Sequence, residues 1–263
     1  MKTKLARGLS LPIKRLADWL DIELAEPLHA RHYETVAEKL ARSFDEEASV
    51  GEGDFGLVGR KELAILVMEG LEPEHRLLDM GCGSGRLAVH AVAFLGAGSY
   101  IGTDISPSML AAAERRVAQQ RPGASCSVSW RMQPAGCFTV ADASVDLLCA
   151  FSVFTHMEAE DTFRYLHAAR RIMKPEGKLV LSCLPLRLPT ARMVFLRQAE
   201  IPLAERWRNV RNVTTSVEQM EGIAELAGWQ VLRWYAGDER CIRLLDSEEL
   251  VDLGESVCVL TVR

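Results

Sequence analysis

The chain has 263 residues, of which 48% are hydrophobic and 25% are charged, so it can bury a core of ordinary globular size. Its formal net charge of -5 provides no overall field for a polyanion, which argues against a nucleic acid substrate. The seven cysteines show no C-x-x-C spacing, and no apolar run nears the roughly 18 residues of a membrane span, so we predict a reduced, cytoplasmic protein without a bound metal.

Residues 1–71 are predicted to form an N-terminal helical extension. Apolar residues recur at helical spacing in residues 13–21, 28–43 and 58–71. Residues 1–17 intersperse lysines and arginines with leucines. We favour a solvated leader or a cap packed on the core, and keep as the alternative a weak membrane-surface contact through residues 1–20.

From Arg76 onward, short apolar runs alternate with helix-like segments, a pattern typical of βαβ units in a parallel sheet. The expected fold is therefore an α/β domain over residues 72–263. An insertion rich in Pro, Arg and Leu at about 184–213 should lie over the carboxyl edge of the sheet, where ligands bind in such folds. Strands are predicted at residues 76–80, 100–103, 125–131, 145–150, 178–183, 230–235 and 256–262.

Local signals mark the ends of several elements. Ser106 followed by Pro107 predicts an N-cap and the first turn of a helix. Thr155-x-x-Glu158 predicts a capping box for the helix after the fourth strand. Lys174-Pro175-Glu176-Gly177 predicts a tight turn before the fifth strand.

The most informative segment is Leu77-Leu78-Asp79-Met80-Gly81-Cys82-Gly83-Ser84-Gly85, an apolar strand that ends in an acid and runs into three glycines. The glycines allow a tight turn and a close approach of the backbone to a ligand, and the helix that they open should offer N–H groups to an anion. A purely structural turn is the alternative. A dinucleotide loop needs Gly or Ala where Arg86 stands, so a pyrophosphate is disfavoured. With Asp79 able to hold an ammonium group, the loop suits a ligand that carries both an ammonium and a carboxylate.

A second acid, Asp104, ends the next predicted strand. An acid in this position can accept hydrogen bonds from both hydroxyls of a ribose. Alone, Asp104 would be interpreted as a solvated residue before a helix. Its combination with the glycine loop favours ribose binding.

Residues 79–85, 104–109, 144–148 and 174–177 together resemble the class I methyltransferases that depend on S-adenosylmethionine (SAM). The resemblance covers roughly residues 76–183. It implies a Rossmann-like seven-stranded sheet of order 3-2-1-4-5-7-6, with the last strand antiparallel, and SAM as the cofactor. Glu176 departs from the family pattern, which often has a second glycine in that turn.

Carried over by position, the resemblance also implies a set of cofactor-binding residues. The methionine end of SAM would contact Asp79, Gly81, Cys82, Gly83 and Gly85. Asp104 would hold the ribose, and Ile105 and Met109 would lie near the adenine. Gln133 is the nearest match to an acid that binds the adenine amino group, and Phe151 completes the set.

His156 follows the fourth predicted strand and is the best candidate for a general base. A histidine that orders this loop or lines the cofactor pocket is the favoured alternative. The segment starting at Phe151 lacks the (N/D/S)-P-P-(Y/F) motif of enzymes that methylate base amino groups, which with the acidic pI disfavours DNA or RNA and favours a small molecule or glycan, methylated on O or N. Residues 234–238 and 253–260 resemble bacterial methyltransferases associated with polysaccharide or glycolipid synthesis, which implies a glycan or glycolipid acceptor. Arginines of the insertion could bind an anionic acceptor or form a solvated face: Arg187, Arg192, Arg197, Arg206, Arg208 and Arg211.

Two rival functions remain. A methyltransferase-like protein could bind SAM or S-adenosylhomocysteine (SAH) without turnover and act as a binding partner. A nicotinamide-dependent oxidoreductase would share the first half of the fold, but Arg86 and the lack of a Tyr-x-x-x-Lys pair oppose it.

Overall fold

The computed structural model describes residues 54–133, 136–202, 205 and 211–263. The helices predicted at residues 13–21 and 28–43, and the basic segment 1–20, lie outside this range. The proposed division between an extension ending at residue 71 and a domain starting at residue 72 therefore stays a prediction.

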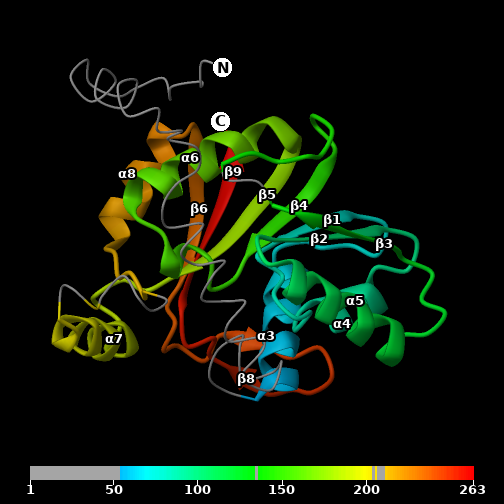
Figure 1. Cartoon of the computed structure of the whole chain (residues 1–263), viewed down its shortest axis with the longest axis horizontal. Coiled ribbons are helices and arrows are strands. Elements are labelled where there is room, and N and C mark those ends of the chain that lie inside the picture. The colour runs from blue at the N-terminus through cyan, green and yellow to red at the C-terminus, as the bar shows by residue number, and fades with distance from the viewer. Residues whose placement is uncertain (1–53, 134–135, 203–204, 206–210) are drawn as a thin grey trace.

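A seven-stranded sheet forms the centre of the molecule (Figure 1). Its strand order is β3-β2-β1-β4-β5-β9-β6, in which the first five strands are parallel and β9 runs antiparallel to both β5 and β6. Because β9 is the seventh strand of this sheet along the chain, the structure confirms the predicted α/β fold and the order 3-2-1-4-5-7-6. The strands are β1 (Arg76–Met80), β2 (Ser99–Asp104), β3 (Ser127–Met132), β4 (Val145–Ala150), β5 (Met173–Cys183), β6 (Trp229–Tyr235) and β9 (Ser256–Val262).

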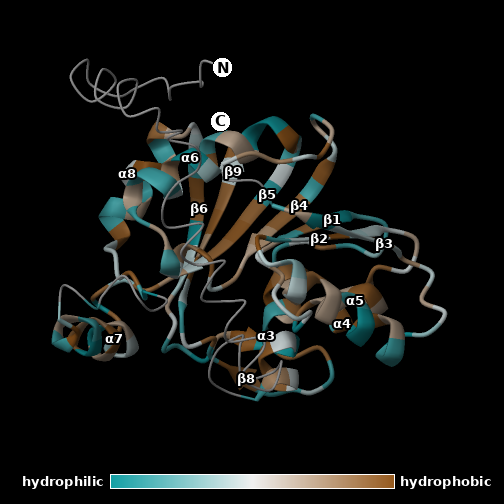
Figure 2. Ribbon diagram, in the orientation of Figure 1, coloured by the Kyte–Doolittle hydropathy of each residue, from teal (hydrophilic) through white to brown (hydrophobic). Residues whose placement is uncertain are grey.

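Helices cover both faces of the sheet, which is why its central strands are mostly apolar and buried instead of alternating (Figure 2). Leu77 of β1 and Leu147 of β4 pack toward one face, whereas Leu78 and Leu148 pack toward the other. The first face is covered by α3 (Phe55–Met68), α4 (Ala88–Phe94) and α5 (Pro107–Gln120), and the second by α6 (Ala159–Ala169) and α8 (Val217–Leu226). Short 3-10 helices occur at η2 (Phe154–His156) and η3 (Arg170–Ile172).

Two further elements lie outside the central sheet and the helices that cover it. Helix α7 (Pro189–Glu200), in the insertion after β5, buries only Ala191 and leaves Met193 and Leu196 more than half exposed. The strands β7 (Ile242–Arg243) and β8 (Leu250–Val251) pair with each other, and β7 packs against α3. The sequence does not predict this ribbon, because strands of two residues are too short to show an alternating pattern.

The local signals have mixed outcomes. Ser106 is confirmed as an N-cap, since its Oγ accepts a hydrogen bond from the Met109 amide at 3.3 Å. The predicted capping box is wrong: Thr155 donates to the Ser152 carbonyl at 3.0 Å, and α6 begins after Glu158, which makes no side-chain cap bond. The predicted turn at residues 174–177 is also wrong, because these residues form an irregularity within β5.

Five of the seven cysteines are buried, and all seven are free thiols. Within the described ranges, no helix has the length and apolar composition needed to cross a bilayer. In the same part of the chain, no three His, Cys, Asp or Glu side chains are grouped so that they could hold a metal ion.

Helix α3 packs directly on the chain that follows β1, and Gly59 makes this contact possible. A Cβ at Gly59 would lie 2.4 Å from the carbonyl oxygen of Arg86. Gly59→Ala is therefore expected to lower the free energy of unfolding by about 1–3 kcal/mol, because this overlap outweighs the gain in helix propensity.

Gly222→Ala, in α8, is the matched control. A Cβ at Gly222 meets nothing within 4 Å, so this substitution should raise the free energy of unfolding by about 0.5–1 kcal/mol. Denaturant unfolding of the two variants measures both values. Equal effects would contradict the tight packing of α3.

Candidate functional site

Four segments meet at the carboxyl edge of the parallel strands. They are the glycine loop after β1 (residues 81–85), Asp104 at the end of β2, residues 151–156 after β4, and Glu255 just before β9. Because β9 is antiparallel to β5, its first residues lie beside the last residues of β5, with Ser256 paired to Cys183. Ligands bind at this edge in open α/β sheets.

The glycine loop has a backbone that only glycine adopts without strain. Gly81, Gly83 and Gly85 have φ values of 72°, 53° and 90°. A Cβ at Gly81 would lie 2.5 Å from a methyl carbon of Val153, and one at Gly85 would lie 3.1 Å from the Cα of Ala113. The loop is therefore fixed from both sides. Turns follow it and α4 begins only at Ala88, so the prediction that the glycines themselves open the helix is wrong.

Asp104 joins the glycine loop to the start of α5. One carboxylate oxygen accepts a hydrogen bond from the Gly83 amide at 3.0 Å, and the other accepts one from the Ser106 amide at 2.8 Å. The side chain is buried, at 8% exposure. A carboxylate has about four lone-pair positions, so a group held in this way can also accept bonds from two hydroxyls.

Asp79 is buried beneath the loop and contacts the neighbouring strands. Its oxygens accept hydrogen bonds from the Tyr100 hydroxyl at 2.5 Å and from the Cys149 thiol at 3.5 Å. Burial raises the pKa of Asp79 to about 7, against the hydrogen bond from Tyr100, which lowers it. The carboxyl is therefore poised between its neutral and charged forms near neutral pH.

A buried ion pair connects α3 with the end of the glycine loop. Arg86 Nη2 lies 2.5 Å from Glu62 Oε1, and both side chains are largely buried. Burial raises the pKa of Glu62, and the charge of Arg86 opposes this rise. Arg86, which argues against a dinucleotide, thus anchors helix α3 to the glycine loop.

The residues predicted near the adenine and the loop are also buried or half-buried. Gln133 donates a hydrogen bond from its side-chain nitrogen to the Cys137 carbonyl, which orients its amide oxygen as the acceptor. Its backbone amide donates to the Asp104 carbonyl at 2.8 Å, so these two predicted residues are adjacent. The remaining residues of this group are Cys82, Met109 and Phe151, which are buried, and Ile105, which is half-buried.

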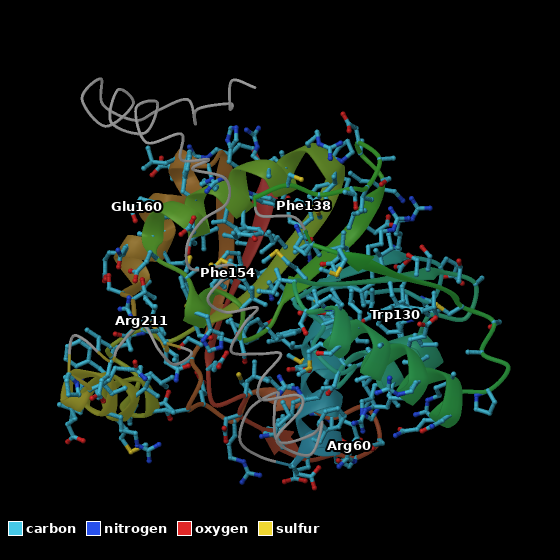
Figure 3. All side chains as sticks on the ribbon, viewed as in Figure 1. Arg60, Trp130, Phe138, Phe154, Glu160 and Arg211 are labelled. Carbon is cyan, nitrogen blue, oxygen red and sulfur yellow. The ribbon has the colours of Figure 1, made fainter. Side chains whose placement is uncertain are left out.

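His156 lies at the carboxyl end of β4 and is held by the chain that follows α7. Its Nδ1 lies 2.7 Å from the Arg211 carbonyl oxygen. A carbonyl only accepts, so Nδ1 carries the proton and Nε2 is the basic nitrogen of the neutral ring. Burial lowers the pKa of His156, which favours this neutral form at pH 7. Figure 3 shows Arg211 on the α7 side of Phe154, the first residue of η2.

The arginines of the insertion that the structure describes differ in their surroundings. Arg187, Arg192 and Arg197 are exposed on or beside α7, whereas Arg211 pairs with Glu158 at 2.5 Å. Arg206 and Arg208 lie outside the described residues.

Two acids at the site are not revealed by the sequence patterns. Glu62 lies in the apolar helix α3. The only signal for it in the sequence is an acid at a position where the helical pattern predicts a buried apolar residue. Glu255 accepts hydrogen bonds from Ser152 Oγ at 3.0 Å and from Ser182 Oγ at 2.5 Å. The position of Glu255 before an antiparallel last strand is a signal that could have placed it at this edge.

Comparison with known proteins identifies the family of this fold. Residues 77–177, which contain β1, the glycine loop, Asp104 and β4, match the family of methyltransferase domains. Residues 77–177 of this chain are therefore part of a methyltransferase domain. The cofactor of this family is SAM.

Sequence relatives of the methyltransferase domain include enzymes with different acceptors. The chain is 26% identical over 228 residues to arsenite methyltransferase of Halobacterium salinarum. This match covers 86% of this chain and 55% of that protein. It is 29% identical over 162 residues to ubiquinone biosynthesis O-methyltransferase of Cereibacter sphaeroides, covering 60% of this chain and 55% of that protein. The chain thus spans about half the length of these curated relatives.

A solved structure shares the fold of the methyltransferase domain. Magnesium protoporphyrin IX methyltransferase of Synechocystis PCC 6803 with bound SAH matches with a TM-score of 0.61, over 89% of this chain and 98% of that chain, at 15% identity. The residues present here fit SAM: three left-handed glycines expose the loop backbone at the carboxyl edge of the sheet, and buried Asp104 supplies carboxylate oxygens next to it.

The raised pKa of Asp79 predicts a pH dependence of stability. Between pH 3.8 and about 7, the folded chain keeps the Asp79 proton, whereas the unfolded chain has lost it. The contribution of this carboxyl to the free energy of unfolding is therefore full below pH 3.8 and is lost as the pH rises through about 7. From about pH 5 to about pH 8, the natural chain should therefore lose on the order of 2 kcal/mol of unfolding free energy relative to Asp79→Asn, which has no carboxyl to titrate.

Asp146→Asn serves as the control for this measurement. Burial opposes the shift, yet the hydrogen bond from Lys174 holds the pKa of Asp146 below 3.8, so its effect on stability should stay constant over the same pH range. Denaturant unfolding of the three proteins at several pH values tests both statements. A constant difference for Asp79→Asn would show that its carboxyl titrates normally.

Proposed function

We propose that this chain is an active SAM-dependent methyltransferase that transfers a methyl group to an oxygen or nitrogen atom of a small molecule, glycan or glycolipid. The observation that carries the proposal is the convergence of the glycine loop, Asp104 and His156 at one edge of the sheet. The first two form a cofactor cradle, and the third brings a basic nitrogen to the same edge.

In this proposal, the residues around the loop bind SAM along its length. The backbone of Gly81 to Gly85 and the acid Asp79 hold the methionine end, and Cys82 belongs to the same turn. Asp104 accepts hydrogen bonds from the ribose hydroxyls. The buried side chains of Met109 and Phe151 and the neighbouring Ile105 surround the adenine, and the amide oxygen of Gln133 accepts from its amino group.

SAM would supply a methyl group bonded to a positively charged sulfonium. In an in-line displacement, the acceptor lone pair would form a bond to the methyl carbon as the bond from this carbon to sulfur breaks. The protein contributes mainly by positioning, because holding reactants about 3–3.5 Å apart and in line can be worth roughly 7–11 kcal/mol. His156 adds a base for an acceptor that must lose a proton. The bond from Nδ1 to the Arg211 carbonyl sets the tautomer in which Nε2 can take that proton.

We place the acceptor on the α7 side of this edge, next to the insertion. Its last described part is tied to the loop after β4, since the Val213 amide donates to the Thr155 carbonyl at 2.6 Å. The exposed Arg187, Arg192 and Arg197 could bind an anionic group on the acceptor. Small acceptors agree with the names of the arsenite and ubiquinone relatives, and the net charge of -5 disfavours a nucleic acid.

Calorimetric titration with SAM, SAH and NAD in parallel tests the cofactor. We expect SAM and SAH to bind and NAD not to bind. Asp104→Ala should weaken SAM binding by roughly 10- to 100-fold, because it removes a buried carboxylate that accepts bonds to the ligand. The exposed Asp238→Ala is the control and should bind like the natural chain. Binding of NAD alone, or unchanged affinity of Asp104→Ala, would refute the assignment.

His156→Gln tests the base. Its amide can still donate to the Arg211 carbonyl, but it has no basic nitrogen. With a hydroxyl acceptor identified by screening sugars and small phenols, kcat should fall by about 10²–10⁴ while the affinity for SAM stays within about twofold. The natural enzyme should also lose activity at acid pH, as the imidazole becomes protonated. An unchanged kcat in His156→Gln would refute the role of His156 as a base and would indicate that it only orders the loop.

A further inference from the structure

Glu255 reaches the site from the far end of the chain. It precedes β9, yet its carboxylate accepts hydrogen bonds from Ser152, which follows β4, and from Ser182 in β5. The Ser182 hydroxyl also accepts the Ser152 amide at 2.7 Å. Two hydroxyls, one just after β4 and one in β5, thus fix the position of a single carboxylate.

This carboxylate lies near both the glycine loop and the proposed base. Ser152 precedes Val153, whose side chain occupies the space over Gly81. The charge of Glu255 acts on Arg86 at one end of the loop and on His156 at the end of β4. The methionine end of the cofactor and the acceptor have to meet in this interval if the proposed function holds.

The backbone of Ser152 supports a specific role for this arrangement. Its φ is 56°, a left-handed conformation that is unfavourable for residues other than glycine. Such backbone strain persists only where the surroundings hold it, and it is concentrated at functional sites. Here the amide and the hydroxyl of Ser152 are both bound by the cluster of Glu255 and Ser182.

We propose that Glu255 recognises the positive charge of the sulfonium, so that the chain holds SAM more tightly than SAH. This inference rests on the proposed function. SAM and SAH differ by one methyl group and one positive charge on sulfur, so a fixed carboxylate near the sulfur is a direct means of telling them apart. Loss of the charge in the reaction then weakens retention of the product and favours its exchange for SAM.

The test compares the ratio of the Kd of SAH to the Kd of SAM in the full chain and in Glu255→Gln, by calorimetry at about pH 8, where Asp79 is mostly charged. The amide is similar in size and can still bond to both serines. We expect the ratio to fall roughly tenfold, mainly because SAM binds more weakly. A purely structural role would weaken SAM and SAH equally and leave the ratio unchanged, which would refute the inference.

Two further variants sharpen the result. Glu248→Gln removes one negative charge from an exposed side chain and should leave the ratio unchanged. Ser152→Ala keeps the charge of Glu255 but removes one of its two anchors, and should lower the ratio by roughly threefold. If Glu255→Gln does not fold, Ser152→Ala decides, and an unchanged ratio refutes the inference. If the natural chain binds neither ligand, the proposed function itself fails; if it binds both and the variants keep its ratio, only the role of Glu255 fails.

Discussion

The carboxylate of Asp104 is the contact on which the geometry of the site depends. It accepts the amides of Gly83 and Ser106, and so fixes the glycine loop against the start of the next helix. The loop cannot hold its shape alone, because its glycines adopt left-handed backbone conformations that cost conformational entropy to order. The Thr103 carbonyl gives the second support, since it accepts the amides of Gly81 and Cys82 at 2.7 and 3.0 Å. The end of β2 therefore shapes the loop after β1.

Buried charge distinguishes the face under α3 from an ordinary apolar core. Glu62, Asp79 and Arg86 lie close enough to affect one another, and two of these three groups are acids that burial pushes toward the neutral form. A single buried charge would be costly, and the Glu62–Arg86 ion pair offsets part of that cost. Helix α3 is thus an electrostatic part of the site as well as a cover for the sheet. A cation bound nearby would shift Asp79 toward its charged form.

The proposed catalytic edge combines segments that are distant in the sequence. His156 follows β4, its ring is held by the Arg211 carbonyl from the insertion, and Glu255 arrives just before the last strand. The antiparallel direction of β9 is what makes the last contribution possible, because a parallel strand would begin at the opposite edge. Function lives in sites built on a shared fold, so these segments are where we expect the acceptor to be recognised.

The sequence by itself determined the α/β class, the strand order through its family resemblance, and the glycine loop with its two acids. These features are legible because each is a local requirement: a buried parallel strand must be apolar, and a left-handed turn must contain glycine. Only the tertiary structure decided the short β7–β8 ribbon, the Glu62–Arg86 pair, the partners of Thr155 and the position of Glu255. These depend on contacts between residues far apart in the chain, such as Ser152 and Glu255, and no pattern within a single segment records which distant side chain will face it.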